Sequence, residues 1–166
     1  WWLREGYARL CGVCPDVTYD IVGARPPRAL QVEAERWPGV FLHGYVADAA
    51  PFWRRAAVLA VPLLSGGGVR VKILEAMAMG VPVVSTSVGC EGLDVRDGEH
   101  LLVADTPEDF AYACAKLLED QDLARQLAQS ARRLILERYD AKVALPLLDL
   151  AYEHAQQEQL SRRASS

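Results

Sequence analysis

Apolar, β-branched runs alternate with segments of helical spacing along most of this chain. The runs predict strands at residues 18–22, 40–42, 58–62, 82–85 and 101–103. The spacing of apolar residues predicts helices at 2–10, 28–37, 51–56 and 70–79. Apolar strands that alternate with helices are typical of an α/β fold, with a mostly parallel, Rossmann-like sheet and helices on both faces.

Helices alone follow the last predicted strand. Pro107 comes directly after Asp105 and Thr106, which supply the capping chemistry of a helix start. Further helices are predicted at 122–138 and 143–157, and a frayed tail at the end of the chain. We therefore expect one domain over residues 1–158 and a tail over 159–166.

Bulk properties narrow the class of protein. The chain has 166 residues, 51% of them hydrophobic, and a net charge of −4. This balance indicates a globular domain and argues against broad binding of nucleic acid.

No apolar run approaches the roughly 20 residues of a membrane span. Charged Arg4, Glu5 and Arg9 interrupt the apolar start, so no signal peptide is predicted there. We expect a cytoplasmic protein.

Four cysteines include one close pair, Cys11 and Cys14. The pair follows a helix, whereas a redox motif needs it at a helix start after a strand. A zinc site would need a second close pair. We expect reduced structural thiols and no metal site.

The most informative segment is 62–84, in which an apolar run leads into three glycines, a helix and a second apolar run. Glycines allow a sharp turn and a close approach of ligand to backbone. The first turn of a helix presents unpaired N–H groups that suit a phosphate. The candidate diphosphate site comprises Ser65, Gly66, Gly67, Gly68, Val69, Arg70 and Lys72.

The helix that follows has two distinct faces. At about 100° per residue, Lys72 and Glu75 share one face with Gly68 and Met79. Ile73, Leu74 and Met77 lie on the opposite face and should pack on the sheet. Arg70 should project toward the apolar side, where the helix start meets the carboxyl edge of the sheet.

The segment 72–84, KILEAMAMGVPVV, closely resembles the donor site of group 1 (family 4) glycosyltransferases. These are metal-independent, retaining enzymes of the GT-B fold. The resemblance continues through the segments 20–23, 43–46, 87–93, 97–98, 101–103 and 137–139. It covers nearly the whole chain, with the motifs in the right order.

The resemblance implies that the chain binds the nucleotide-sugar donor of a glycosyltransferase. Glu75 matches the glutamate that accepts hydrogen bonds from the ribose, and two carboxylate oxygens suit a vicinal diol. The loop and Lys72 would hold the diphosphate, with no metal and no cofactor. The resemblance places these residues around the base and sugar: Gly23, His43, Gly44, Tyr45 and Glu91. Glu91 either shapes this pocket or caps a turn.

One departure from the family concerns the donor sugar. The first glutamate of the family's pair falls at Gly67, so its carboxylate is absent here. Ser65 and loop amides are then the expected sugar contacts. Neither the sugar nor the base is predicted.

The resemblance also implies parts that this sequence does not contain. Family enzymes have a second, N-terminal domain that binds the acceptor, a glycan or a lipid-linked saccharide, and some of these enzymes sit peripherally at the inner membrane face. The donor domain's own first, central strand is also expected before Trp1, and without it the core should have a gap. We assign no catalytic residue here and expect the isolated chain to be inactive.

Two other functions fit the same residues. One is a nucleotide-binding module without chemistry. The other is half of a nucleotide-sugar 2-epimerase, which shares the two-domain fold but needs ionisable groups around the sugar, where Gly67 stands.

Overall fold

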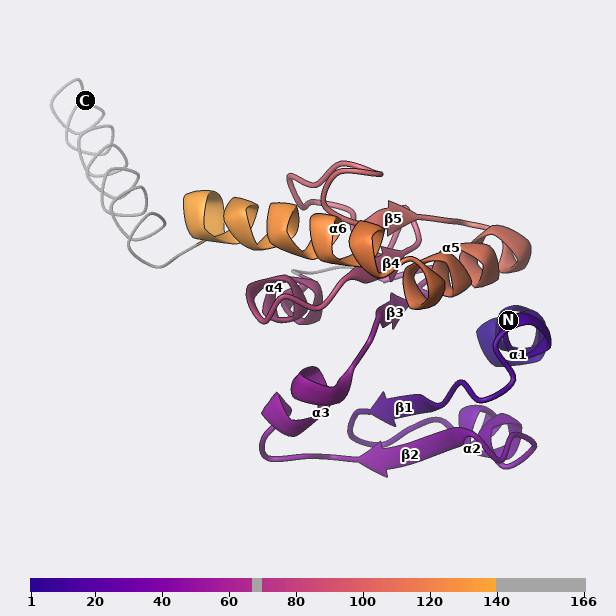
Figure 1. Cartoon of the computed structure of the whole chain (residues 1–166). Helices are drawn as coiled ribbons and strands as arrows, with labels where there is room; N and C mark the ends of the chain where they lie inside the picture. The colour runs from indigo at the N-terminus through magenta and orange to yellow at the C-terminus, as the bar shows by residue number, and fades with distance from the viewer. Residues whose placement is uncertain (67–69, 140–166) are drawn as a thin grey trace, which may run out of the picture.

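The fold is a parallel α/β arrangement whose sheet is in two parts (Figure 1). The computed structural model describes residues 1–66 and 70–139. One part pairs β1 (Tyr19–Val22) with β2 (Val40–Gly44), and the other has the order β3 (Leu59–Val61), β4 (Val83–Ser85), β5 (Leu102–Val103). All three strand pairings are parallel, as predicted from the alternation of strands and helices.

Helices fill the connections between the strands. The short π-helix η1 (Trp2–Gly6) runs into α1 (Tyr7–Val13), and four further helices follow at α2 (Arg28–Ala34), α3 (Ala50–Arg55), α4 (Val71–Ala78) and α5 (Pro107–Glu119). The described chain ends with α6 (Gln121–Leu134) and the π-helical turn η2 (Ile135–Tyr139). The helix predicted at 143–157, the tail 159–166 and the loop residues Gly67, Gly68 and Val69 lie outside the described residues.

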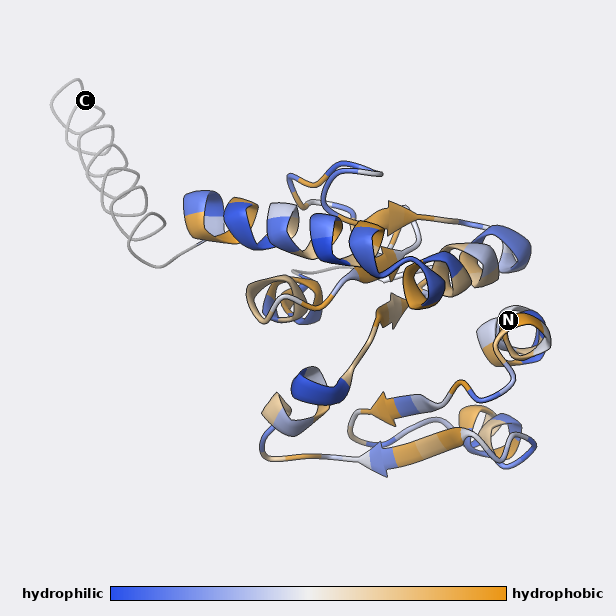
Figure 2. Cartoon of the chain, viewed as in Figure 1, coloured by the Kyte–Doolittle hydropathy of each residue, from blue (hydrophilic) through white to orange (hydrophobic). Residues whose placement is uncertain are grey.

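The two faces of β4 bury different clusters, because side chains alternate along a strand. Val84 packs with η1, α1 and α5 in a first hydrophobic cluster. Val83 packs with α4 and α6 in a second. Helices therefore cover both faces of β4, as predicted, and the outward face of α6 is polar (Figure 2).

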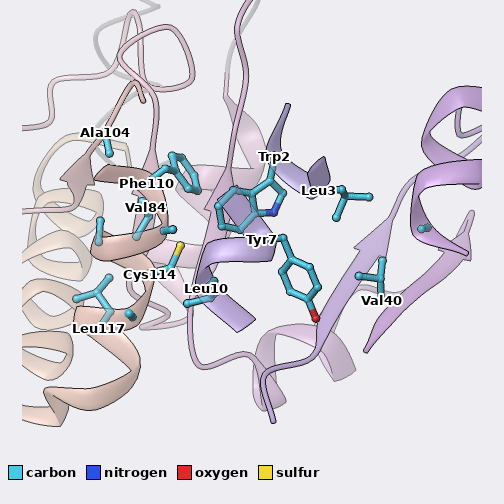
Figure 3. Packing of buried hydrophobic residues seen from close by; sticks show 14 of the residues in the cluster. Trp2, Leu3, Tyr7, Leu10, Val40, Val84, Ala104, Phe110, Cys114 and Leu117 are labelled. Atoms are coloured by element: carbon cyan, nitrogen blue, oxygen red, sulfur yellow. The ribbon is translucent and has the colours of Figure 1, made fainter. Parts of the chain in front are cut away.

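The first cluster contains the buried aromatic side chains of Trp2, Tyr7 and Phe110 (Figure 3). The ring of Trp2 meets Phe110 of α5 edge to face, with centroids 4.8 Å apart. On its other side Trp2 meets Tyr7 and Tyr19, at 6.3 and 6.1 Å. This cluster joins the β1–β2 part of the molecule to the β3–β5 part.

The sheet is interrupted between β1 and β3. Predicting each strand by itself does not show which strands pair. The amide of Tyr19 donates to Gly39, and that of Leu59 to Pro82, away from each other. Because successive residues of a strand alternate sides, the amides of Asp20 and Ala60 face the space between the two parts.

This space is a cavity of about 1040 Å³, called the central cavity below. Apolar residues of β1 and β3 line its floor, including Ile21 and Ala60, and α4 contributes one wall. The gap expected in the core is therefore present, at the position where one more parallel strand would complete the sheet.

Candidate functional site

The carboxyl ends of β3, β4 and β5 form the edge at which open α/β sheets bind ligands. Three segments meet there: residues 62–66 after β3, the turn 86–92 after β4, and Asp105 after β5. The Asp105 carboxylate accepts hydrogen bonds from the amide and the hydroxyl of Ser87, at 2.8 and 3.0 Å. The turn after β4 is thereby fixed to the end of β5.

The start of α4 lies beside this edge and carries no acidic cap. The N-cap residue Arg70 makes no side-chain capping bond, and the first turn contains Lys72 but no acidic residue. By contrast, Thr106 caps α5 and Asp120 caps α6. A positive charge opposes the helix dipole at an N-terminus, so this start is electrostatically suited to an anion.

Lys72 and Glu75 lie on one face of α4, as their spacing predicted. The ammonium of Lys72 contacts the Glu75 carboxylate at 2.8 Å. Both side chains line the central cavity, together with Ala78 and Met79. The opposite face is buried at Ile73 and Met77. One cation and one carboxylate thus stand together in the wall of the central cavity.

Arg70 points toward the sheet edge, as predicted, and bridges two loops. One guanidinium nitrogen donates to the carbonyl oxygen of Gly66 at 2.8 Å and to that of Val88 at 3.0 Å. Gly66 has φ +140°, a conformation that favours glycine.

A second group of polar residues gathers where β1 and β2 end. Asp20 accepts from His43 at 2.5 Å and pairs with Arg55 at 2.8 Å. Phe52 packs its ring on both partners of Asp20. Sequence reasoning missed Asp20 as the partner of both His43 and Arg55. The available signal was a lone carboxylate within an otherwise apolar strand.

The predicted base and sugar residues divide between two hollows. Gly23 and Tyr45 line the central cavity with Lys72 and Glu75. His43 and Gly44 line a separate hollow of about 600 Å³ between α2 and β2. The amide of Gly23 donates to the Gly44 carbonyl at 2.9 Å, which fixes the two strand ends to each other.

The remaining predicted residues lie in the loops of the sheet edge. Ser65 and Gly66 are exposed in the segment after β3. Glu91 is exposed in the turn after β4 and lies outside both hollows. Its amide donates to Val88 in that turn at 3.4 Å.

The cysteines are all free thiols. Burial raises the pKa of Cys114 to about 12, and it also raises the pKa of Cys14 and Cys90. Among residues 1–66 and 70–139, no cluster of three or more His, Cys, Asp or Glu side chains could hold a metal ion. Within the same residues no helix is both long and apolar enough to cross a membrane.

The sequence profile described as "Glycosyl transferases group 1" matches residues 1–120. This chain belongs to the group 1 glycosyl transferase family. It is 32% identical over 165 residues to a phosphatidyl-myo-inositol mannosyltransferase of Mycobacterium leprae, covering 90% of this chain and 43% of that protein. It is also 37% identical over 81 residues to an uncharacterized 44.6 kDa protein of the cps region of Klebsiella pneumoniae, covering 49% of this chain and 21% of that protein. The chain thus spans less than half the length of these relatives.

Solved structures place the fold of this group 1 domain. The C-terminal domain of a group 1 glycosyl transferase from Francisella tularensis matches with a TM-score of 0.71 at 21% identity, over 82% of this chain and 77% of that one. Anabaena HepE, solved in complex with UDP, matches with a TM-score of 0.75 at 20% identity, over 92% of this chain and 46% of that one. The fold is that of the C-terminal domain of a GT-B glycosyltransferase.

Proposed function

We propose that this domain binds the nucleoside diphosphate of a nucleotide-sugar donor, and that the longer enzyme transfers the sugar to a glycan or lipid-linked acceptor with retention of configuration. The observation that carries the proposal is the Lys72–Glu75 pair on the cavity face of α4, beside a helix start without an acidic cap.

Each member of the pair has a distinct chemical task. Glu75 presents two acceptor oxygens, which fit the two hydroxyls of a ribose. Lys72 lies in the first turn of α4, and the glycines precede that turn in the sequence, where a diphosphate would sit. When the bond from the sugar to the diphosphate breaks, negative charge collects on the diphosphate oxygens. Fixed donors and cations stabilise such developing charge most strongly.

Relatives support the same chemistry without naming the donor of this chain. The mycobacterial relatives are mannosyltransferases, and HepE was solved with UDP and with UDP-glucose. These relatives therefore fix neither the base nor the sugar of the donor, and the titration includes more than one base.

Calorimetric titration with UDP, GDP and ADP tests the proposal. We expect one diphosphate to bind, and Glu75→Ala to weaken it about tenfold or more, because a hydrogen-bonded carboxylate contributes about 1.5–3 kcal/mol. Glu99→Ala is the matched control, since Glu99 also pairs with a basic residue three positions away, Arg96, at 3.2 Å. Equal affinity of the two variants, or a folded wild type that binds none of the three, would contradict the proposal.

A further inference from the structure

The segment 62–66, which leads from β3 to the glycine loop, is held by its carbonyl oxygens. The hydroxyl of Thr86 donates to the carbonyl of Leu63 and accepts the amide of Gly89 at 2.9 Å. Thr86 is 1% exposed. A single buried hydroxyl therefore joins the segment after β3 to the turn after β4.

The turn fits against β3 because residue 89 is a glycine. A Cβ on Gly89 would overlap the hydroxyl of Ser85 and would lie 3.0 Å from both Thr86 Oγ1 and the carbonyl oxygen of Val61. The amide of Thr86 also donates to that Val61 carbonyl, at 3.2 Å. The close approach of backbone to backbone leaves Thr86 well placed to reach Leu63.

Arg70 connects the same two segments at a second point. Its guanidinium donates to Gly66 of the first segment and to Val88 of the second. Gly66 also lies against this side chain, since a Cβ there would be 3.6 Å from an Arg70 nitrogen. One guanidinium nitrogen of Arg70, Nη2, is thus held by two backbone carbonyls of the protein.

The direction of these bonds bears on anion binding. The C=O and the following N–H of a peptide unit point in opposite directions. When the carbonyl of Leu63 turns toward Thr86, the amide of Leu64 turns away from it. The peptide unit of Leu63 and Leu64 therefore presents its N–H on the side away from Thr86, and N–H groups are the donors that an anion requires.

We propose that Arg70 and Thr86 are positioning residues of the donor diphosphate site: they fix segments 62–66 and 86–92 to each other, and Arg70 does not contact the diphosphate. This inference rests on the proposed function for the identity of the ligand. It changes the sequence-based prediction, which gave Arg70 a place among the diphosphate ligands.

Two variants and a conservative control test the inference. Arg70→Gln and Thr86→Val each remove one bridge, and Thr86→Ser keeps the hydroxyl. Hydrogen exchange of the free protein, followed by mass spectrometry, reports the two segments, and titration with UDP, GDP and ADP reports binding. We expect both variants to exchange faster in both segments and to bind about tenfold more weakly, with Thr86→Ser close to the wild type. The double variant should bind only slightly more weakly than the weaker of the two single variants, because the two side chains act on one unit.

Other outcomes separate the two proposals. Suppose that Arg70→Gln weakens binding while hydrogen exchange in the free protein is unchanged, and that its loss of binding free energy adds fully to that of Thr86→Val. Arg70 then contacts the diphosphate, and the inference is overturned. If the wild type binds no diphosphate although both variants exchange faster, the proposed function fails and the bridging role stands. Far-ultraviolet circular dichroism of every variant excludes global unfolding as the cause.

Discussion

At the scale of the residue, the pair of Lys72 and Glu75 determines what the cavity can offer a ligand. Their side chains are 67% and 40% exposed. An exposed ion pair of this kind contributes only about 0–1 kcal/mol, so separating it costs little. The ammonium and the carboxylate are then available to different groups of one ligand, as the proposed binding of diphosphate and ribose requires.

The buried thiol of Cys114 should make the free energy of unfolding depend on pH in the alkaline range. Burial raises its pKa from 9.0 to about 12, so the unfolded chain loses the thiol proton first. The protonated thiol of Cys114 therefore favours the folded state. Its contribution to the free energy of unfolding is complete below pH 9 and is lost as pH rises from about 9 to about 12. We expect the free energy of unfolding to fall over this range, by at most about 1.4 kcal/mol per pH unit for this group.

Urea unfolding at a series of pH values, in the presence of reductant, measures this effect. Cys114→Ala should show a shallower decline than the wild type over the same range, because it removes the thiol. Desolvation also raises the pKa of Tyr7 and of Tyr19, and both tyrosines are present in both proteins. Parallel curves would show that Cys114 does not titrate differently on unfolding.

At the scale of the element, α5 depends on its cap. The Thr106 hydroxyl oxygen accepts the amide of Asp109 at 3.1 Å, and Pro107 occupies the first turn. Thr106→Ala should lower the free energy of unfolding by about 1 kcal/mol. Thr106→Ser keeps the acceptor and should lose much less. Denaturant unfolding compares the two, and equal losses would mean that the hydroxyl does not stabilise the helix.

The elements that were predicted well are those whose signals lie within a few residues. Asp105, Thr106 and Pro107 predicted where α5 begins, and the observed start is Pro107. Apolar runs located all five strands of the described chain, with ends shifted by one or two residues. The strand predicted at 58–62 ends at Val61, because Pro62 has no amide to donate to a ladder.

Other elements differ because tertiary contacts decide them. The helix predicted at 2–10 begins as the π-helix η1 and continues to Val13. The ring of Trp2 lies over Gly6, where a Cβ would clash with it, so packing of this ring shapes the local backbone. The sequence pattern contains no sign of that constraint.

In the candidate site, too, local signals place some residues and tertiary contacts place others. Helical periodicity alone placed Lys72 and Glu75 on one face, and the structure agrees. The position of His43 was not predictable in this way, since it depends on the pairing of β1 with β2. That pairing shifts register between Ile21 and Val22, and His43 then meets Asp20 and the hollow behind β2.

At the scale of the whole molecule, side chains rather than a continuous sheet hold the two parts together. Phe110 is fully buried and contacts Trp1 and Trp2, at 5.6 and 4.8 Å between ring centroids. Phe110→Ala should cost about 3–5 kcal/mol. It should also let the β1–β2 part open at lower denaturant than the β3–β5 part, which residue-level hydrogen exchange would detect as two separate transitions.

Phe41→Ala is the matched control for this experiment. Phe41 lies on β2 and is 47% exposed, so its removal leaves the contact between the two parts intact. We expect a small loss of stability and a single transition. A single transition in Phe110→Ala as well would show that the cluster does not control how the two parts separate.

The interrupted sheet also has a consequence for the order of events in folding. Every strand pairing joins a strand to the next one along the chain, so each part can form from nearby residues. The contact of Trp2 with Phe110, by contrast, joins the start of the chain to α5, which follows all five strands of the described chain in the sequence. Closing so long a loop has a high entropic cost and slows the step that depends on it. The two parts should therefore form early and separately, and their docking through the aromatic rings should set the rate at which the native state appears.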